Sequence, residues 1–187
     1  MPDKNILEQP VSPHLWYAVR TFNCQEHKVS RFLTEKEWVH FIPMTYVQTA
    51  ISNEGEEKKS KPILVPAVHN LLFIQQKSDE KEVFRILKEC PVPVSVFRNP
   101  GEGKPCTISS RDMEELRQLC DPQYKTAVFM TQGEAEAMVG KDVRVVNGPF
   151  KGAVGRLVRK NKKFYFLKAV IGMGVMVRIS RWYCEPI

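Results

Sequence analysis

Cysteine and histidine are the side chains of this sequence that could act as nucleophiles, bases or metal ligands. The four histidines fall in different predicted elements, without a serine, aspartate or cysteine at the spacing of a catalytic site. No two of the five cysteines have the C-x-x-C spacing of a zinc ribbon or a dithiol redox centre. We therefore predict no metal site, and we interpret the cysteines as reduced, small apolar residues. The cysteines are Cys24, Cys90, Cys106, Cys120 and Cys184.

Two short segments share features with known sites but lack their context. The segment from Gly101 to Pro105 has the glycines and the lysine of a phosphate loop, but not the strand, the full motif and the helix around it. Cys24 stands near a predicted helix start, where a thiol can be activated. A thiol enzyme therefore stays as an alternative that alkylation and mass spectrometry would test. We expect no catalysis and no cofactor.

The charge of the chain is distributed unevenly between its two parts. The 187 residues carry a formal net charge of +7. Residues 141–187 contain 11 Lys and Arg against two acids, a net +9, so residues 1–140 hold 17 basic and 19 acidic side chains, a net −2. This asymmetry predicts two units, the second of which can attract polyanions.

Two features of the sequence predict where in the cell the protein is found: the length of its apolar runs and the composition of its first residues. No apolar run approaches the roughly 18 residues of a membrane-spanning helix. The segment from Met1 to Pro13 is polar and lacks the basic flank and apolar stretch of a secretory signal. We expect a cytoplasmic protein that does not contact a membrane.

Residues 1–120 alternate between strand and helix patterns. The order β-α-β-β-α-β-α predicts an α/β sandwich of the split βαβ type. A charged segment, Ser52–Lys61, interrupts it as a hairpin tip or loop. The predicted elements are a strand at Leu15–Phe22, a helix opened by Asn23 with Glu26 completing its cap, strands at Val39–Ile51 (with an edge or bulge at Pro43) and Ile63–Gln75, a helix after Ser78, a strand at Val92–Phe97 and a helix at Ser110–Cys120.

The pattern changes after Gly140 to short strands without a helix signal. Residues 121–139 have weak periodicity and are predicted to connect the two units, although Tyr124–Met130 is apolar enough to pack on either. Five short strands in so few residues predict a small β-barrel over residues 140–187. These strands are Asp142–Val146, Gly152–Arg159, Phe164–Val170, Val175–Ile179 and Trp182–Pro186.

The most specific motif runs from Val143 to Gly155. Gly148-Pro149 predicts a tight turn, and Gly152 and Gly155 let the following strand bend. The spacing resembles the KOW motif of NusG proteins and of certain ribosomal proteins. The resemblance implies an SH3-like barrel, so the expected fold class is α+β: the sandwich followed by a small KOW barrel.

The N-terminal part resembles the NusG N-terminal domain. The aromatic opening Trp16–Val19, the helix with Glu26 and the Phe41-Ile42-Pro43 continuation follow in the order of that family. The segment Lys61–Ile74 departs from it, because Leu64-Val65-Pro66-Ala67 replaces an aromatic-Pro-Gly sequence. The resemblance implies a non-enzymatic transcription elongation factor.

The family resemblance also implies a partner for the N-terminal part. NusG-like domains receive the clamp helices of RNA polymerase in an apolar depression of the sheet, and Trp16, Leu64, Val65 and Pro66 fall on the matching positions. Tyr17 alternates to the face opposite Trp16. The alternative is that these side chains belong to the core. The charged tip Glu54–Lys61 takes the place of the family's hairpin, or is a solvated loop.

Basic side chains accompany aromatic ones in the predicted barrel. Phe164 and Phe166 alternate with Tyr165, so one set must be core. Basic and aromatic residues together can bind single-stranded nucleic acid, although a solvated basic face gives the same pattern. The candidate nucleic-acid-binding residues are Arg156, Arg159, Lys160, Lys162 and Lys163.

The loop Ala169–Val177 is where family barrels recruit a termination factor or a ribosomal protein. Ile171, Met173 and Met176 are the candidate contacts, and Ile171 and Met173 replace an aromatic residue and an arginine expected of a general factor. This departure favours a specialised antiterminator that suppresses pausing or termination in particular operons. We expect the protein to be a monomer. A ribosome-associated RNA-binding protein with a KOW barrel is the alternative, against which the net −2 of residues 1–140 argues.

Overall fold

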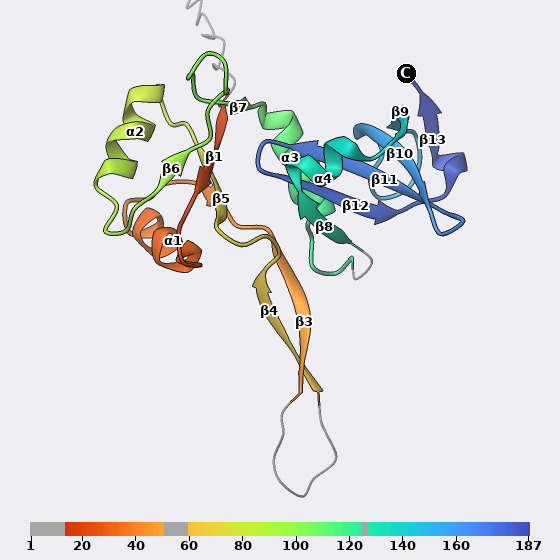
Figure 1. Ribbon diagram of the computed structural model, residues 1–187, viewed down its shortest axis with the longest axis horizontal. Coiled ribbons are helices and arrows are strands. Elements are labelled where there is room, and N and C mark those ends of the chain that lie inside the picture. Colours follow the sequence, from red (N-terminus) through yellow and green to blue (C-terminus); the bar gives the residue numbers. More distant parts are fainter. Residues whose placement is uncertain (1–13, 51–59, 125–126) are drawn as a thin grey trace, which may run out of the picture.

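The computed structural model describes residues 14–50, 60–124 and 127–187. Two units lie side by side, with helix α3 (Ser110–Leu119) between them and a two-stranded arm projecting from the first (Figure 1). We refer to the described residues up to 120 as the N-terminal unit and to residues 127–187 as the C-terminal unit. The first is a mixed sandwich of helices and strands and the second is dominated by one sheet. The predicted fold class is confirmed.

The sheet of the N-terminal unit has the order β2-β5-β1-β6, with β7 also paired to β1. Every pairing in it is antiparallel. Strand β5 separates β1 from β2, the next strand along the chain, which is the arrangement that defines a split βαβ unit. The strands are β1 (Trp16–Arg20), β2 (His40–Phe41), β5 (Leu71–Gln75), β6 (Ser95–Val96) and β7 (Thr107–Ile108).

The two faces of this sheet pack against different partners. Tyr17 and Val19 pack in one core with α1 (Glu26–Glu35) and α2 (Glu80–Lys88). Trp16 and Ala18 lie in the other core, with α3 and the C-terminal unit. The two-residue period of a strand thus divides the molecule into two cores. Helical spacing in the sequence predicts an apolar face on each of α1, α2 and α3. Phe32 of the first face is half-buried, and the other predicted residues are buried: Val29, Leu33, Val83, Ile86, Leu87, Met113, Leu116 and Leu119.

Helix starts follow the sequence signals at two of three positions. Asp79 caps α2 by accepting a hydrogen bond from the Glu82 amide, and Ser109 caps α3 through the Asp112 amide. The prediction that Asn23 caps α1 is wrong, because the helix begins later, after Gln25, and has no side-chain cap.

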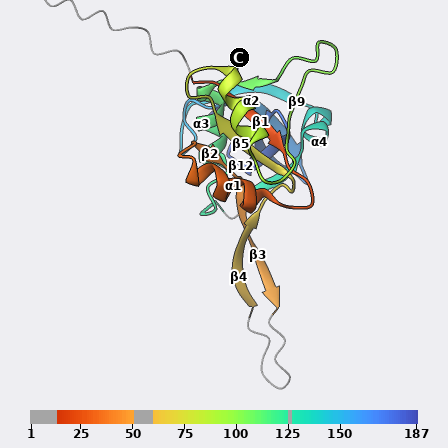
Figure 2. The same cartoon turned by 90° about the vertical axis from the view of Figure 1, so that its left-hand side faces the viewer.

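The arm consists of β3 (Met44–Ala50) and β4 (Ser60–Pro66), which pair only with each other (Figures 1 and 2). The predicted strand Val39–Ile51 is divided into β2 and β3 around Pro43, which cannot donate a ladder hydrogen bond. The predicted strand Ile63–Gln75 is likewise divided into β4 and β5. The charged segment Ser52–Lys61 lies outside the described residues except for its last two.

The C-terminal unit is an antiparallel sheet of the order β13-β9-β10-β11-β12-β8. At Gly155 of β10 a Cβ atom would lie 2.5 Å from the Leu167 carbonyl oxygen of the neighbouring strand, so only glycine fits. The strands are β8 (Val128–Thr131), β9 (Gly140–Val145), β10 (Val154–Lys160), β11 (Lys163–Val170), β12 (Met173–Arg178) and β13 (Cys184–Pro186), the last preceded by the 3₁₀ turn η1 (Arg181–Tyr183).

The connection predicted over residues 121–139 contains regular structure. Strand β8 pairs with β12, and α4 (Gln132–Ala137) packs on the same sheet through Ala135. A capping box between Thr131 and Glu134 starts this helix. The sequence signal was weak because β8 and α4 are short and take their stability from packing on the sheet.

Candidate functional site

The predicted docking residues of the N-terminal unit lie in two different environments. Leu64 is 46% exposed on the arm, whereas Trp16 is 4% exposed beneath α3. Val65 and Pro66 are half-buried at the base of the arm. The structure therefore groups Leu64, Val65 and Pro66 on β4 and separates Trp16 from them. Because the Trp16 indole is covered, it does not form part of an exposed docking surface.

The arm exposes more apolar side chains than the sequence analysis identified. Tyr46, 53% exposed, lies directly across the strand pair from Leu64, and Val47 lies across from Ile63. Because side chains alternate, Tyr46 and Leu64 occupy one face and Val47 and Ile63 the other. An isolated two-stranded sheet with apolar residues on both faces is typical of a segment that a partner completes.

A groove lies beside the base of the arm. It has a volume of about 580 Å³ and runs between β4 and α3. Its apolar walls come from both elements, and Leu64 is part of the lining. In the sequence, the run Phe41–Met44 before the arm is the feature that indicates this groove. The apolar lining residues are Phe41, Ile42, Met44, Leu64, Cys120 and Pro122.

The two units share a continuous apolar interface. Met173 and Val175 of β12 lie in the same buried core as Phe73 of β5 and Leu116 of α3. A Cβ atom built on Gly172 would approach the Leu71 side chain to 2.8 Å, so the turn before β12 sits directly on β5. Next to it, the rings of Tyr124 and Phe150 meet edge to face at 4.9 Å.

A buried lysine links the two units electrostatically. The Lys168 ammonium, on β11, donates hydrogen bonds of 2.6 Å to both Asp112 and Glu115 of α3, and the Lys168 residue is 6% exposed. Burial acts to raise the pKa of Asp112, but hydrogen bonds from Lys168 and Ser109 outweigh it and lower that pKa. Glu115 also accepts a hydrogen bond from the Val154 amide. In the sequence, the spacing of Asp112 and Glu115, one helical turn apart on α3, is the feature that indicates this contact.

The predicted partner-binding residues of the C-terminal unit are covered. Met173 is fully buried in the interface, and Ile171 is half-buried beside it. Met176 faces the other side of β12, where it packs with Ala135 of α4. The three side chains therefore do not form one exposed patch in this arrangement.

The predicted nucleic-acid residues divide into an exposed group and one that is already engaged. Arg159, Lys160, Lys162 and Lys163 are exposed around the β10–β11 turn. Arg156 instead donates a 2.7 Å hydrogen bond to the Met138 carbonyl and lies 3.8 Å from Asp142. Four neighbouring cations on one turn form a compact site of positive potential.

One exposed aromatic residue, Trp182, was predicted from the sequence only as part of a strand. Trp182, in η1, is largely exposed, and the Arg181 guanidinium lies 4.4 Å from the centre of its ring. This arrangement is a cation–π pair at the surface.

Among the described residues, no helix is long and apolar enough to cross a membrane.

A split βαβ sandwich followed by a six-stranded antiparallel sheet defines a two-unit α+β class of protein. The family model described as "Transcription termination factor nusG" matches residues 14–117. This match covers more than half of the sequence, and the chain belongs to the NusG family. Members of this family are non-enzymatic transcription elongation and termination factors that bind RNA polymerase.

Among solved structures, the chain is similar to NusG of Thermotoga maritima, in a structure described as "Domain interaction in Thermotoga maritima NusG". The two chains are 17% identical, and the match covers 93% of this chain and 97% of that one, with a TM-score of 0.46. No curated protein matches the chain.

Proposed function

We propose that this protein binds the clamp helices of RNA polymerase through the β3–β4 arm and the groove at its base, and that it suppresses pausing or termination. The observation that carries the proposal is the exposed apolar arm, on which Leu64 and Tyr46 form a cross-strand pair. Helix-in-groove recognition needs such side chains next to an apolar depression, and Leu64 lines one. The mechanism is mechanical: a docked factor holds the clamp closed on the nucleic acids.

The C-terminal unit adds a second contact in this proposal. Its exposed cations around the β10–β11 turn bind nucleic acid near the polymerase. Recruitment of a ribosomal protein or a termination factor through Ile171 and Met173 requires the two units to separate, because the N-terminal unit covers these residues. A contact through Met176 requires α4 to move as well, because Met176 packs against Ala135 within the C-terminal unit. This requirement, with the departures at Ile171 and Met173, supports a specialised antiterminator over a general factor.

The docking face can be tested with two matched substitutions on β4. Leu64→Asp places a charge on the face that carries Tyr46 and borders the groove, and Ile63→Asp places the same charge on the opposite face. Both sites are exposed, so neither change buries a charge. We expect Leu64→Asp to weaken binding to core RNA polymerase at least about tenfold, because the charge must be desolvated on docking. Ile63→Asp should bind within about twofold of wild type.

Interferometry with immobilised core polymerase measures both affinities, and circular dichroism verifies the fold. Equal affinities for wild type and Leu64→Asp would contradict the proposed docking face. A loss confined to Ile63→Asp would move the site to the Val47 face.

A further inference from the structure

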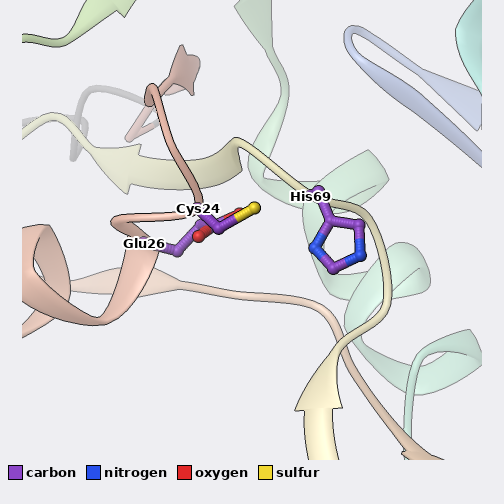
Figure 3. Close-up of side chains that lie close together, drawn as sticks. All are labelled: Cys24, Glu26 and His69. Carbon is purple, nitrogen blue, oxygen red and sulfur yellow. The ribbon is translucent and has the colours of Figure 1, made fainter.

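We propose that Cys24, Glu26 and His69 form a zinc-binding site on the N-terminal unit, a property that does not depend on polymerase binding. One ligand atom from each side chain lies within 4.8 Å of the other two. Figure 3 shows the Cys24 sulfur pointing toward the His69 ring, with the Glu26 carboxylate beside it. Cys24 lies in the turn before α1, Glu26 is the first residue of α1, and His69 comes from the connection between β4 and β5.

The donor set selects the class of metal. A thiolate, an imidazole and a carboxylate together suit Zn²⁺ and similar divalent transition metals, and do not suit Mg²⁺ or Ca²⁺. In a tetrahedral zinc site the ligand atoms are about 3.3–3.8 Å apart, so these atoms must approach by roughly 1 Å. Cys24 and His69 are exposed and can rotate to close that gap. Three protein ligands leave a fourth position for water.

Glu26 gives an independent reason for a cation at this position. It is 1% exposed, and it accepts a hydrogen bond from the Asn70 amide. Within the described parts of the chain, no Lys, Arg or His side chain lies within ion-pair distance of it. A buried carboxylate without a cationic partner is costly, and a metal ion would supply the missing charge.

Asn70 holds the two ligand-bearing segments together. Its side-chain oxygen accepts a 2.9 Å hydrogen bond from the Cys24 amide, and its own amide donates to Glu26. Asn23, Cys24 and Asn70 all have left-handed backbone conformations, with φ of 55°, 52° and 60°. Non-glycine residues adopt this region at a cost, so the surrounding hydrogen bonds must fix it. These contacts hold the backbone segments that carry Cys24 and Glu26 next to Asn70, the neighbour of His69, before any metal binds.

The test uses the full chain, reduced and freed of metal. Zn²⁺ is titrated against a chromophoric chelator, and Co²⁺ absorption reports whether a thiolate is bound. We expect one equivalent of Zn²⁺ and a thiolate-to-cobalt charge-transfer band. Cys24→Ser should abolish that band, and Cys24→Ser and His69→Gln should each weaken Zn²⁺ binding at least about tenfold.

His27→Gln and Cys90→Ser are the matched controls, because they remove the same donor types outside the site, and both should behave as wild type. Glu26→Gln changes a buried side chain, and this variant can fail to fold. The test therefore relies on the variants of the exposed ligands, Cys24 and His69. The proposal is overturned if wild type shows no thiolate band, or if the Cys24→Ser, His69→Gln double variant binds Zn²⁺ as tightly as wild type.

Discussion

Leu64 on the β3–β4 arm exposes 46% of its surface, whereas Met173 at the start of β12 exposes none. Both positions were assigned to partners from the sequence, and both are apolar. On the arm the paired strands use neither face for an internal core, so their side chains are free for another molecule. At β12 the N-terminal unit already covers Met173. The same residue class is thus exposed on the arm and buried between the two units at β12.

This difference in exposure indicates which of the two proposed contacts can form first, the one through the arm or the one through the β11–β12 connection. The arm can dock without any change in the rest of the chain. The β11–β12 connection becomes available only after an apolar interface and the Lys168 ion pairs have been separated. Any partner of that connection must therefore bind tightly enough to offset the loss of this interface.

A carboxylate placed at Met173 or at Leu64 should give the largest difference in the free energy of unfolding between the two positions. Met173→Asp puts an unpaired carboxylate into the interface, and we expect it to lower the free energy of unfolding by several kcal/mol. Leu64→Asp, on the exposed arm, should change that free energy by less than about 0.5 kcal/mol. Urea denaturation followed by circular dichroism measures both.

Met173→Leu is the control for the covered position, because it keeps the volume and should cost less than about 1.5 kcal/mol. If Met173→Asp were as stable as Leu64→Asp, the two units would not be packed together in solution.

The ion pair between the units should have a smaller effect. Lys168→Met removes the ammonium that Asp112 and Glu115 share, and leaves Glu115, 12% exposed in its side chain, with Arg111 as its remaining cationic partner. Because Asp112 is half-exposed and can be solvated, we expect a loss of about 1–3 kcal/mol in the free energy of unfolding. The same denaturation experiment measures it.

Lys162→Met serves as the matched control, since it deletes the same side chain at an exposed turn. Adding Glu115→Gln to Lys168→Met should recover part of the stability, because one of the two neighbouring carboxylates that lost the shared ammonium is then neutral. No difference between Lys168→Met and Lys162→Met would mean that the ion pair contributes nothing to the closed arrangement.

The sequence predicted what periodicity and turn chemistry determine. Alternation in β1 placed Trp16 and Tyr17 on opposite faces, and helical spacing identified the buried faces of α1, α2 and α3. It missed what depends on packing between distant segments. The short strand β8 is stabilised by β12, and nothing in Val128–Thr131 alone specifies that pairing.

The candidate sites show the same limit. The apolar residues of β4 were found, but whether a given apolar side chain is covered depends on how the units pack, as Met173 shows. Cys24 and His69 were dismissed as ligands because they are far apart in the chain and fit no spacing rule. They meet only because Asn70 joins the start of α1 to the β4–β5 connection.

The smallest effect concerns the exposed cations of the C-terminal unit. Arg156 already contacts Met138 and Asp142, which leaves Arg159, Lys160, Lys162 and Lys163 to bind phosphates. Neutralising about four phosphates of single-stranded RNA predicts a log–log slope of affinity against salt near −3. Lys162→Gln combined with Lys163→Gln should reduce that slope by about 1.4, at roughly 0.7 per lost contact.

Fluorescence anisotropy of labelled single-stranded RNA, titrated with the full chain at several salt concentrations, measures the slope. Arg144→Gln combined with Lys151→Gln is the control, because it removes the same charge near the opposite end of β10, where Arg144 pairs with Val154. A site at the β10–β11 turn requires the first pair to change the slope and the second to leave it nearly unchanged. Equal changes would indicate that RNA responds to the net charge of the unit, and an absence of binding at low salt would mean that the turn is a solvated face. The comparison with the arm would then become sharper, because the exposed apolar arm would remain as the candidate binding surface among those predicted from the sequence.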